Sequence, residues 1–536
     1  MTTKTVIPET GDSSSRENIM LGNRIRLGVS RLTVTVTILA IVILGGFIAY
    51  YLWNRPVDHT NPQRMADLKK AKLTRATLRL GEEKIDVWPQ WRGPWRDGVS
   101  EESEFLTNWP ESGPKVLWKQ PCGVGYSSFA VADGKVYTMA QEGGNEVVLC
   151  WEAETGKRLW RFGYPAKFTD SYGNGPRCTP TVEDGRVYTV GATGKMHCLK
   201  TEPESEDGEV IWSKDLLSEY NSNNMRWGTS FSPLIYKDLI YVTPGGDGHC
   251  AVALDKKTGK EVWKALDGPA GYSSPIVVTL ADTVQILYFT GTEVAGLNPE
   301  TGEVLWQTPW ETRYDCNTAT PIVSDNYVFV SSGYGTGCGL FEVEKTSEGK
   351  FSVHEVYKKH HVMDTHFSSC VLHEGHVYGF NDDRFSCLDM RTGKTKWQDR
   401  KRTVKAKGAC MLADGYLFIQ DGDGPLVLAK ATPEKFEPIV TASIGEESQC
   451  WVCPVLANGR LYTRDRNGVT CFDLLTKAPV LPKVAGKEQP TSISWIAVAA
   501  GMAVLLLIGC VALYMRTRSV RKSVVPPTID NPDTNG

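Results

Sequence analysis

The 536-residue sequence predicts an all-β fold, an eight-bladed β-propeller of four-stranded blades closed by its two ends, flanked by two transmembrane helices. Three observations support this prediction. A Thr-Gly turn followed by a tryptophan recurs along the middle of the chain, a second series of turn signals gives the same count, and two long uncharged apolar segments lie near the ends. Repeats of about 40–50 residues containing four short strands are typical of propeller blades.

The overall charge is close to balanced. Lys and Arg number 59 and Asp and Glu 62, so the net charge is −3, and apolar residues make up 41%. A nucleic-acid partner favours a basic surface, so this balance argues against one. The apolar content predicts a folded chain rather than a disordered one.

Residues 32–53 and 494–515 are the two predicted transmembrane helices. Each has 22 residues without a charged side chain, enough to span about 30 Å of hydrocarbon as a helix. The alternatives are a buried core helix or, for the first segment, a signal peptide. Arginines before the first span and after the second predict cytoplasmic tails at 1–31 and 516–536 and an extracytoplasmic middle. The expected location is therefore an inner or plasma membrane.

Residues 54–113 are predicted to be a linker and lead-in. The stretch 67–80 is rich in Lys and Arg, and it suggests either a solvated linker or a short basic helix at the membrane surface. The stretch 88–100, punctuated by Pro and Gly, is expected to pack on the propeller rim. After the propeller, residues 477–493 form a second linker.

The repeat is clearest in four copies of Thr-Gly-Lys/Glu-x-x-Trp, which end at Trp160, Trp263, Trp306 and Trp397. Weaker copies extend the series to eight positions spaced 40 to 52 residues apart: 118, 160, 212, 263, 306, 357, 397 and 440. The glycine allows the positive φ of a tight turn, and the tryptophan is expected to pack between neighbouring blades. The predicted docking residues are Trp118, Trp160, Trp212, Trp263, Trp306 and Trp397.

Eight turns such as Asp133-Gly134 and Asn458-Gly459 give the same number of blades. The last unit ends at Asp473 without a fourth strand, and a strand around Trp118 lacks a partner before it. Pairing the first strand with the last would close the ring and remove its open edges. The propeller is therefore predicted to span residues 114–476.

The Thr-Gly-x-x-x-Trp repeat resembles the tryptophan-docking repeat of the pyrroloquinoline quinone (PQQ) propeller superfamily. That superfamily includes quinoprotein dehydrogenases and cofactor-free BamB-like envelope proteins. The opening Trp88-Pro-Gln-Trp-Arg-Gly-Pro94 is similar to the entry segment of BamB-like proteins. The resemblance implies the propeller fold over about 360 residues and leaves two functional classes open.

The residues that accompany the cofactor in quinoprotein dehydrogenases have no clear match here. Those enzymes stack PQQ against two adjacent cysteines joined by a disulfide, and this sequence has no Cys-Cys pair. Cys450 and Cys453 are the nearest pair, and their disulfide would need a bulged strand. Cys150, Cys198, Cys387 and Cys471 recur at one repeat position, as small apolar strand residues. No cofactor is expected, and PQQ and calcium belong only to the alternative function.

Two further groups of residues stand out as candidate sites. Six histidines lie in the stretch from His354 to His376. An ordinary polar loop is the favoured interpretation of this stretch, and a metal site is the alternative. Residues that precede each innermost strand are expected to surround the central funnel, and such residue types dominate recognition surfaces. They are Tyr126, Arg177, Trp227, Tyr272, Asn317, His366, Lys407 and Trp451.

The sequence thus predicts a membrane-anchored propeller that acts as a non-enzymatic binding or assembly scaffold in the cell envelope, with an envelope protein or polymer as partner. The alternative is a PQQ-dependent oxidoreductase of the alcohol dehydrogenase type. A ligand sensor that signals through the two spans is a third possibility, but the tails offer no output domain.

Overall fold

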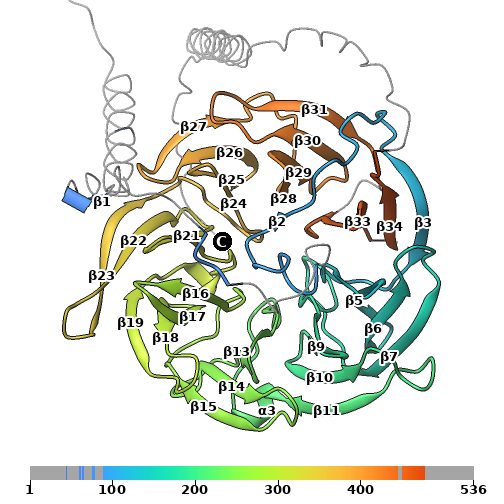
Figure 1. Cartoon of the computed structure of the whole chain (residues 1–536), viewed down its shortest axis with the longest axis horizontal. Coiled ribbons are helices and arrows are strands. Elements are labelled where there is room, and N and C mark those ends of the chain that lie inside the picture. Colours follow the sequence, from blue (N-terminus) through green and yellow to red (C-terminus); the bar gives the residue numbers. More distant parts are fainter. Residues whose placement is uncertain are drawn as a thin grey trace, which may run out of the picture. The chain divides into compact units, whose positions relative to one another are not determined.

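The computed structural model describes residues 44, 59–61, 63–64, 75–78, 88–444, 449–466 and 468–476. Eight β-sheets stand around a common centre (Figure 1). The predicted all-β propeller of eight four-stranded blades is confirmed. Within the described ranges, no helix has the length and apolar character needed to cross a bilayer. The predicted spans at 32–53 and 494–515 lie outside those ranges, apart from Leu44.

The first four blades follow one another along the chain. Blade 1 contains β4 (Ala130–Ala132), β5 (Lys135–Glu142), β6 (Asn145–Glu152) and β7 (Arg158–Pro165). Blade 2 contains β8 (Thr181–Glu183), β9 (Arg186–Val190), β10 (Lys195–Lys200) and β11 (Val210–Asp215). Blade 3 contains β12 (Leu234–Tyr236), β13 (Leu239–Val242), β14 (Ala251–Asp255) and β15 (Glu261–Ala265). Blade 4 contains β16 (Ile276–Leu280), β17 (Thr283–Phe289), β18 (Glu293–Leu297) and β19 (Val304–Pro309).

The other four blades complete the ring. Blade 5 contains β20 (Ile322–Ser324), β21 (Tyr327–Ser332), β22 (Gly337–Lys345) and β23 (Phe351–Lys359). Blade 6 contains β24 (Val371–His373), β25 (His376–Asn381), β26 (Arg384–Asp389) and β27 (Lys394–Gln398). Blade 7 contains β28 (Ala409–Ala413), β29 (Tyr416–Gln420), β30 (Leu426–Lys430) and β31 (Glu437–Ala442). Blade 8 contains β32 (Val455–Ala457), β33 (Arg460–Arg464), β34 (Gly468–Asp473) and β3 (Lys115–Pro121).

A few short elements lie outside this plan. Strand β1 (His59–Thr60) extends blade 5 by pairing with β23, and β2 (Val99–Ser100) pairs in parallel with β28 of blade 7. The described helices are α3 (Leu216–Glu219) and the 3₁₀ turn η1 (Arg313–Asp315).

Local sequence explains the first hairpin of each blade. Asp133 and Gly134 both have positive φ, 51° and 72°, in the turn that joins β4 to β5. Two-residue hairpin turns favour this conformation because it matches the twist of the flanking strands, and Asp-Gly adopts it readily. The strands on either side are almost fully buried, since each blade is covered by its two neighbours.

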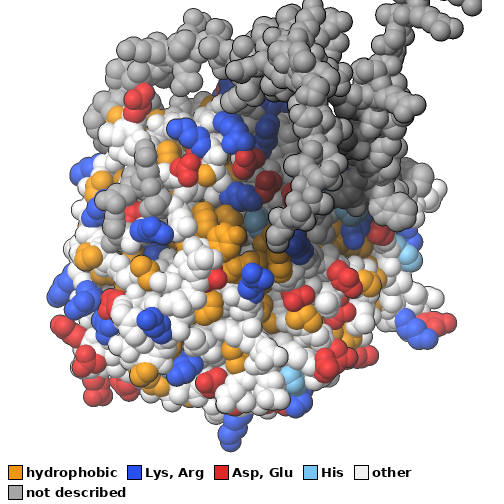
Figure 2. Space-filling model, turned by 180° about the vertical axis from the view of Figure 1, so that it is seen from behind, with side chains coloured by type: hydrophobic (Ala, Val, Ile, Leu, Met, Phe, Trp, Pro, Cys, Tyr) orange, Lys and Arg blue, Asp and Glu red, His pale blue; other side chains and the backbone are white. Residues whose placement is uncertain are grey.

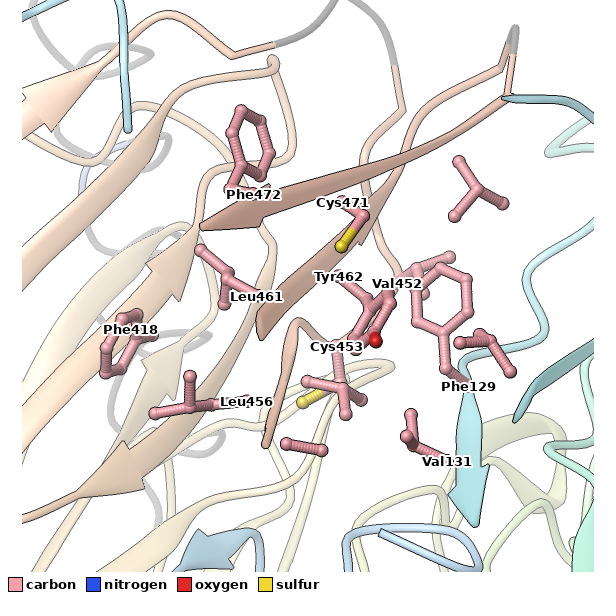
Figure 3. Close-up of a cluster of buried hydrophobic side chains, with 14 of the residues drawn as sticks. Phe129, Val131, Phe418, Val452, Cys453, Leu456, Leu461, Tyr462, Cys471 and Phe472 are labelled. Carbon is pink, nitrogen blue, oxygen red and sulfur yellow. The ribbon is translucent and has the colours of Figure 1, made fainter. Parts of the chain in front are cut away.

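The first strand closes the ring onto the last unit. Strand β3 pairs antiparallel with β34, which places Trp118 opposite Cys471. The interface between blades 8 and 1 is filled by a buried hydrophobic cluster, in which Phe129 and Tyr462 lie with ring centroids 6.1 Å apart (Figure 3). Each blade therefore has a packed neighbour on both sides.

The tryptophan of one blade lies on the Thr-Gly turn of the next. The Trp118 Nε1–H donates to the carbonyl of Ala153 at 2.9 Å. Gly156 lies beneath the indole, where a Cβ atom would stand only 2.6 Å from the ring. The same bond to the next blade recurs from Trp160 to Thr201, Trp212 to Lys256, Trp263 to Pro299 and Trp397 to Thr432.

Three positions of the series depart from this pattern, and one of them, Val440, has no hydrogen-bond donor in its side chain. Trp306 donates to the Oε1 atom of Gln285 within its own blade, at 2.7 Å. At position 357 a tyrosine replaces the indole, and the Tyr357 hydroxyl donates to the Met390 carbonyl at 2.7 Å. Gly393 lies under the Tyr357 ring as other turn glycines lie under tryptophan. At position 357 the tyrosine hydroxyl therefore takes the place of the indole N–H.

The recurring cysteines fill one small space between aromatic rings. Cys150 stands opposite Tyr137 on one side and Trp160 on the other. The other three repeat cysteines, Cys198, Cys387 and Cys471, have the same Tyr and Trp neighbours in their blades. Burial raises the pKa of each of these thiols to about 12. Cys453 is a free thiol, so the candidate disulfide between Cys450 and Cys453 is not formed.

Candidate functional site

A cavity of about 180 Å³ lies at the centre of the ring. Loops between the blades supply most of its lining, together with Trp91 and Arg92 from the lead-in. Six of the eight predicted funnel residues are among the lining side chains: Tyr126, Arg177, Trp227, Tyr272, His366 and Trp451. Their role in binding remains a prediction.

Aromatic rings around the cavity form a closed chain of contacts. Its shortest contacts join Trp451 to Phe367 at 4.4 Å and His366 to Tyr334 at 4.5 Å between ring centroids. In order, the chain runs through Tyr126, Trp451, Phe367, His366, Tyr334, Trp227 and Tyr172. The Tyr126 hydroxyl then donates to the Tyr172 carbonyl and closes the circle. The wall of the cavity is therefore a continuous set of aromatic faces and edges.

Three members of this aromatic ring were not predicted. Phe367 follows the predicted His366 directly. Tyr172 comes from the loop between β7 and β8, and Tyr334 from the turn between β21 and β22. The prediction considered only the residues just before each innermost strand. In each blade the turn between the second and third strands lies on the same side of the ring as these residues. Including these turns in the search would have identified Tyr334.

The other two predicted funnel residues, Asn317 and Lys407, are not among the side chains that line this cavity. Asn317 is fully buried, and its Nδ2 donates to the carbonyls of Thr290, Gly291 and Trp310 at 2.8 to 3.1 Å. Its Oδ1 accepts from the Ser332 hydroxyl at 2.7 Å. An amide in the entry loop can satisfy neighbouring backbone groups instead of facing the funnel, and the sequence pattern does not separate these roles.

Lys407 acts on the cavity through His366. Its Nζ donates to Nδ1 of His366 at 2.7 Å and pairs with Asp382. Because an ammonium group can only donate, Nδ1 accepts and the proton of the neutral imidazole lies on Nε2. Burial and the Lys407 charge lower the His366 pKa to about 4. His366 is therefore neutral at pH 7.

Arg177 is the cation in the cavity wall. Its guanidinium lies over the rings of Phe168, at 4.6 Å, and Tyr126, at 5.5 Å. It also donates to the carbonyls of Gly173 and Gly175. Burial lowers the Arg177 pKa. The lining residues that the structure describes include no Asp or Glu, so the cavity presents cationic and N–H donor groups and no carboxylate.

The lead-in crosses the centre of the propeller instead of packing on its rim. Trp88 pairs with Val131 of β4, and the Pro89 carbonyl accepts from the backbone of Val182 in β8. Val99 reaches β28 on another side of the ring. The expectation for this segment was wrong because the innermost strands have unpaired edges facing the channel, and the lead-in supplies their hydrogen bonds.

Two buried arginines fix this segment. Arg96 is 2% exposed and donates to the carbonyls of Pro233 and Pro275, both at 2.6 Å. Burial lowers the Arg96 pKa to about 9. Arg92 donates to the Cys370 carbonyl at 2.5 Å and lies at the floor of the cavity. The guanidinium group of Arg92 therefore places a positive charge of the protein at the floor of the cavity.

Neither interpretation of residues 67–80 fits the part that is described. Arg75 bridges to Ser324 and Thr77 to Val278, which are antiparallel contacts with first strands of blades 5 and 4. Arg75 also pairs with Asp97 at 3.0 Å. Residues 75–78 are thus extended and attached to the propeller, because the inner strand edges again provide partners for the backbone.

The described lining of the cavity does not fit a calcium ion. Calcium is held by several oxygen ligands, most often carboxylates, and this lining includes no Asp or Glu. The histidine-rich stretch does not supply a metal site either. Among the described residues, no group of three or more His, Cys, Asp or Glu side chains could hold a metal ion.

The repeat, the blade closure and the central site define a propeller of the PQQ-repeat class. The family model described as "Outer membrane protein assembly factor BamB" matches residues 107–202 and 144–399, more than half of the chain. The chain belongs to this family.

Individual proteins of known sequence or structure resemble this chain at low sequence identity. The BamB protein of Burkholderia pseudomallei is 24% identical over 374 residues, which cover 66% of this chain and 86% of the relative. The BamB structure from Moraxella catarrhalis has a TM-score of 0.47 at 17% identity, and covers 67% of this chain and 99% of its own. The quinohemoprotein alcohol dehydrogenase of Comamonas testosteroni has a TM-score of 0.49 at 13% identity, with 82% and 88% coverage.

Proposed function

We propose that this chain is a non-enzymatic binding or assembly scaffold of the cell envelope, held by two membrane spans with its propeller outside the cytoplasm. Membership of the BamB family, whose description is an outer membrane protein assembly factor, supports an assembly role. The two uncharged 22-residue segments and their flanking arginines support the anchoring. The partner is an envelope protein or polymer.

The observation that carries this proposal is the closed aromatic ring around a cavity without carboxylates. Tyr and Trp are the residues that most often contribute strongly to binding between proteins. General acid–base catalysis at neutral pH is most efficient with a group that titrates near pH 7, whereas burial and the Lys407 charge lower the pKa of the cavity histidine to about 4. The site is therefore suited to holding a ligand rather than transforming it, and no cofactor is part of the proposal.

Site-specific photo-crosslinking in cell membranes tests the scaffold. A benzophenone amino acid replaces Tyr172 at the cavity mouth, where 55% of the side chain is exposed. The matched control replaces Val262, which is 50% exposed on outer strand β15. We expect adducts with defined envelope partners from position 172 alone. Absence of adducts there, or identical adducts from both positions, would contradict a binding role for the mouth.

The enzymatic alternative has its own test. Purified full-length protein is titrated with PQQ and Ca²⁺ in a calorimeter and assayed for dye-linked alcohol oxidation. The proposal expects neither saturable binding nor turnover. Micromolar or tighter binding with turnover would overturn it and make the protein an oxidoreductase.

A further inference from the structure

Three exposed tyrosines gather around one tryptophan at the mouth of the cavity. Tyr172, Tyr314 and Tyr334 are 55%, 38% and 38% exposed. Their ring centroids lie 6.1, 5.7 and 6.4 Å from that of Trp227. Aromatic side chains grouped in this way are characteristic of protein interaction sites, whereas single exposed apolar residues are common on any surface.

Two arginines lie against the same rings. The Arg226 guanidinium stands 5.5 Å from the Trp227 centroid and 4.9 Å from that of Tyr314. The Arg313 guanidinium lies 4.8 Å from the Tyr314 centroid. No carboxylate in the described part of the chain forms an ion pair with either arginine. A guanidinium stacked on a ring keeps its N–H edge available for a carboxylate from outside.

The backbone holds two of these tyrosines in an unfavourable conformation. Tyr314 has a φ of 65° and Tyr334 a φ of 60°, both in the left-handed region. Such angles are uncommon for residues other than glycine, asparagine and aspartate. The two rings face each other edge to face, with centroids 5.4 Å apart. The loops thus present tyrosine where asparagine or glycine would fit the backbone better, which points to a use for the rings.

A groove next to these residues has room for a peptide backbone. Its volume is about 640 Å³, and Arg226 and Tyr314 form part of its lining. Asn223 lines it as well, and its amide can pair with an extended chain. Asp247 and Asp315 also lie there, so the groove itself is not uniformly basic. The carboxylates of an acidic ligand would therefore lie against the two arginines, and its uncharged residues would lie along the groove.

We propose that Tyr172, Arg226, Trp227, Arg313, Tyr314 and Tyr334, here called the tyrosine–arginine rim, bind an acidic protein segment that carries an aromatic side chain. The aromatic side chain packs among the tyrosines and the carboxylates pair with Arg226 and Arg313. This proposal rests on the scaffold function above and specifies the chemistry of its partner.

Peptide binding to the full-length protein in detergent tests this proposal. The probe is a fluorescein-labelled peptide with the central sequence Asn-Asp-Tyr-Asp-Asn, compared with Asn-Lys-Tyr-Lys-Asn and Asn-Asp-Ala-Asp-Asn. Two double variants, R226Q/R313Q and Y314N/Y334N, remove the charges and the rings separately, and asparagine suits the left-handed backbone. K257Q/K260Q, on the Thr-Gly turn of blade 3, is the control for loss of charge.

We expect the Asp-Tyr-Asp peptide to bind, and either rim variant to weaken its Kd by tenfold or more. The control should leave Kd within twofold, and higher salt should weaken binding to the wild type but not to R226Q/R313Q. Unchanged melting curves of the variants will show that they fold. The proposal would be overturned if both rim variants bound the peptide as tightly as the wild type, if the wild type preferred the Lys-Tyr-Lys peptide, or if it bound no peptide.

Binding to anionic phosphatidylglycerol vesicles without binding to the peptide would also overturn it, because the rim would then recognise a lipid surface. The crosslinking experiment separates this failure from failure of the scaffold. Adducts at position 172 that persist without peptide binding contradict only the acidic specificity. Loss of both contradicts the scaffold as well.

Discussion

Tyr126 and Trp451 stack across the junction where the ring of blades closes, with centroids 5.2 Å apart and planes inclined by 22°. Tyr126 precedes the first strand of blade 1, and Trp451 precedes that of blade 8. Their contact links the β3–β34 closure to the aromatic wall of the cavity. Stability of the closure and shape of the site should therefore depend on the same pair.

Trp451→Ala should lower the free energy of unfolding by about 1–3 kcal/mol, because a large partly buried ring and its aromatic contacts are lost. Trp451→Phe keeps a ring at this position and should lose less than half as much. Urea unfolding of the purified protein measures both values. Equal losses in the two variants would mean that the stacked contact contributes nothing of its own.

Gly302→Ala tests the docking of Trp263 on the next blade. Gly302 has a φ of 74°, and a Cβ atom there would lie 2.6 Å from the Trp263 ring. Gly134→Ala is the matched control, with a φ of 72° and no atom within 4 Å of the added Cβ. Both variants suffer the backbone cost of about 1–2 kcal/mol. Gly302→Ala should be less stable by roughly a further 1–3 kcal/mol because of the overlap.

Arg96→Met should release the lead-in from the centre of the propeller. The substitution leaves the buried Pro275 carbonyl without its donor and leaves the Pro233 carbonyl with the Thr181 hydroxyl alone, at a cost of about 1–3 kcal/mol. Limited proteolysis should then cleave near residue 88 at least tenfold faster. Arg161→Met removes a partly exposed pair with Glu142 and should cost less than about 1 kcal/mol. Equal protease resistance of the two variants would contradict the anchoring role of Arg96.

Stability should fall on acidification because of His366 and His197. Burial lowers the pKa of both to about 4, below the usual value of 6.5. Between pH 6.5 and 4 the unfolded chain binds more protons than the folded one, so stability decreases as the pH falls through this window. The melting temperature of wild type should drop more steeply there than that of His366→Gln or His197→Gln. Parallel curves would contradict the depressed pKa values.

Charged side chains of both signs lie on the face of the molecule shown in Figure 2. Positive and negative side chains are interspersed over the visible face, in agreement with the net charge of −3. Such a surface has no large field of one sign to steer a highly charged polymer. We therefore expect recognition to depend on local groups such as the aromatic ring and the tyrosine–arginine rim.

Most of the fold was predictable because its signals are local and repeated. The Thr-Gly turns, the Asp-Gly turns and the alternating strands each recur, and each copy needs only its own residues to form a blade. Ring closure was also predictable, because the last unit lacks a fourth strand after Asp473 and the unpaired strand at Trp118 can supply it. The funnel positions followed from the register of the repeat, which placed six of eight candidates at the cavity.

The sequence by itself determined the number of blades, the docking positions and the loops that surround the centre, since periodic local patterns encode them. The tertiary structure alone decided that residues 88–100 cross the channel, that Asn317 turns into the core and that seven aromatic side chains form one closed ring. These features depend on contacts between blades far apart in the chain. No local pattern records which unpaired strand edge or aromatic face a distant segment will meet once the ring has closed.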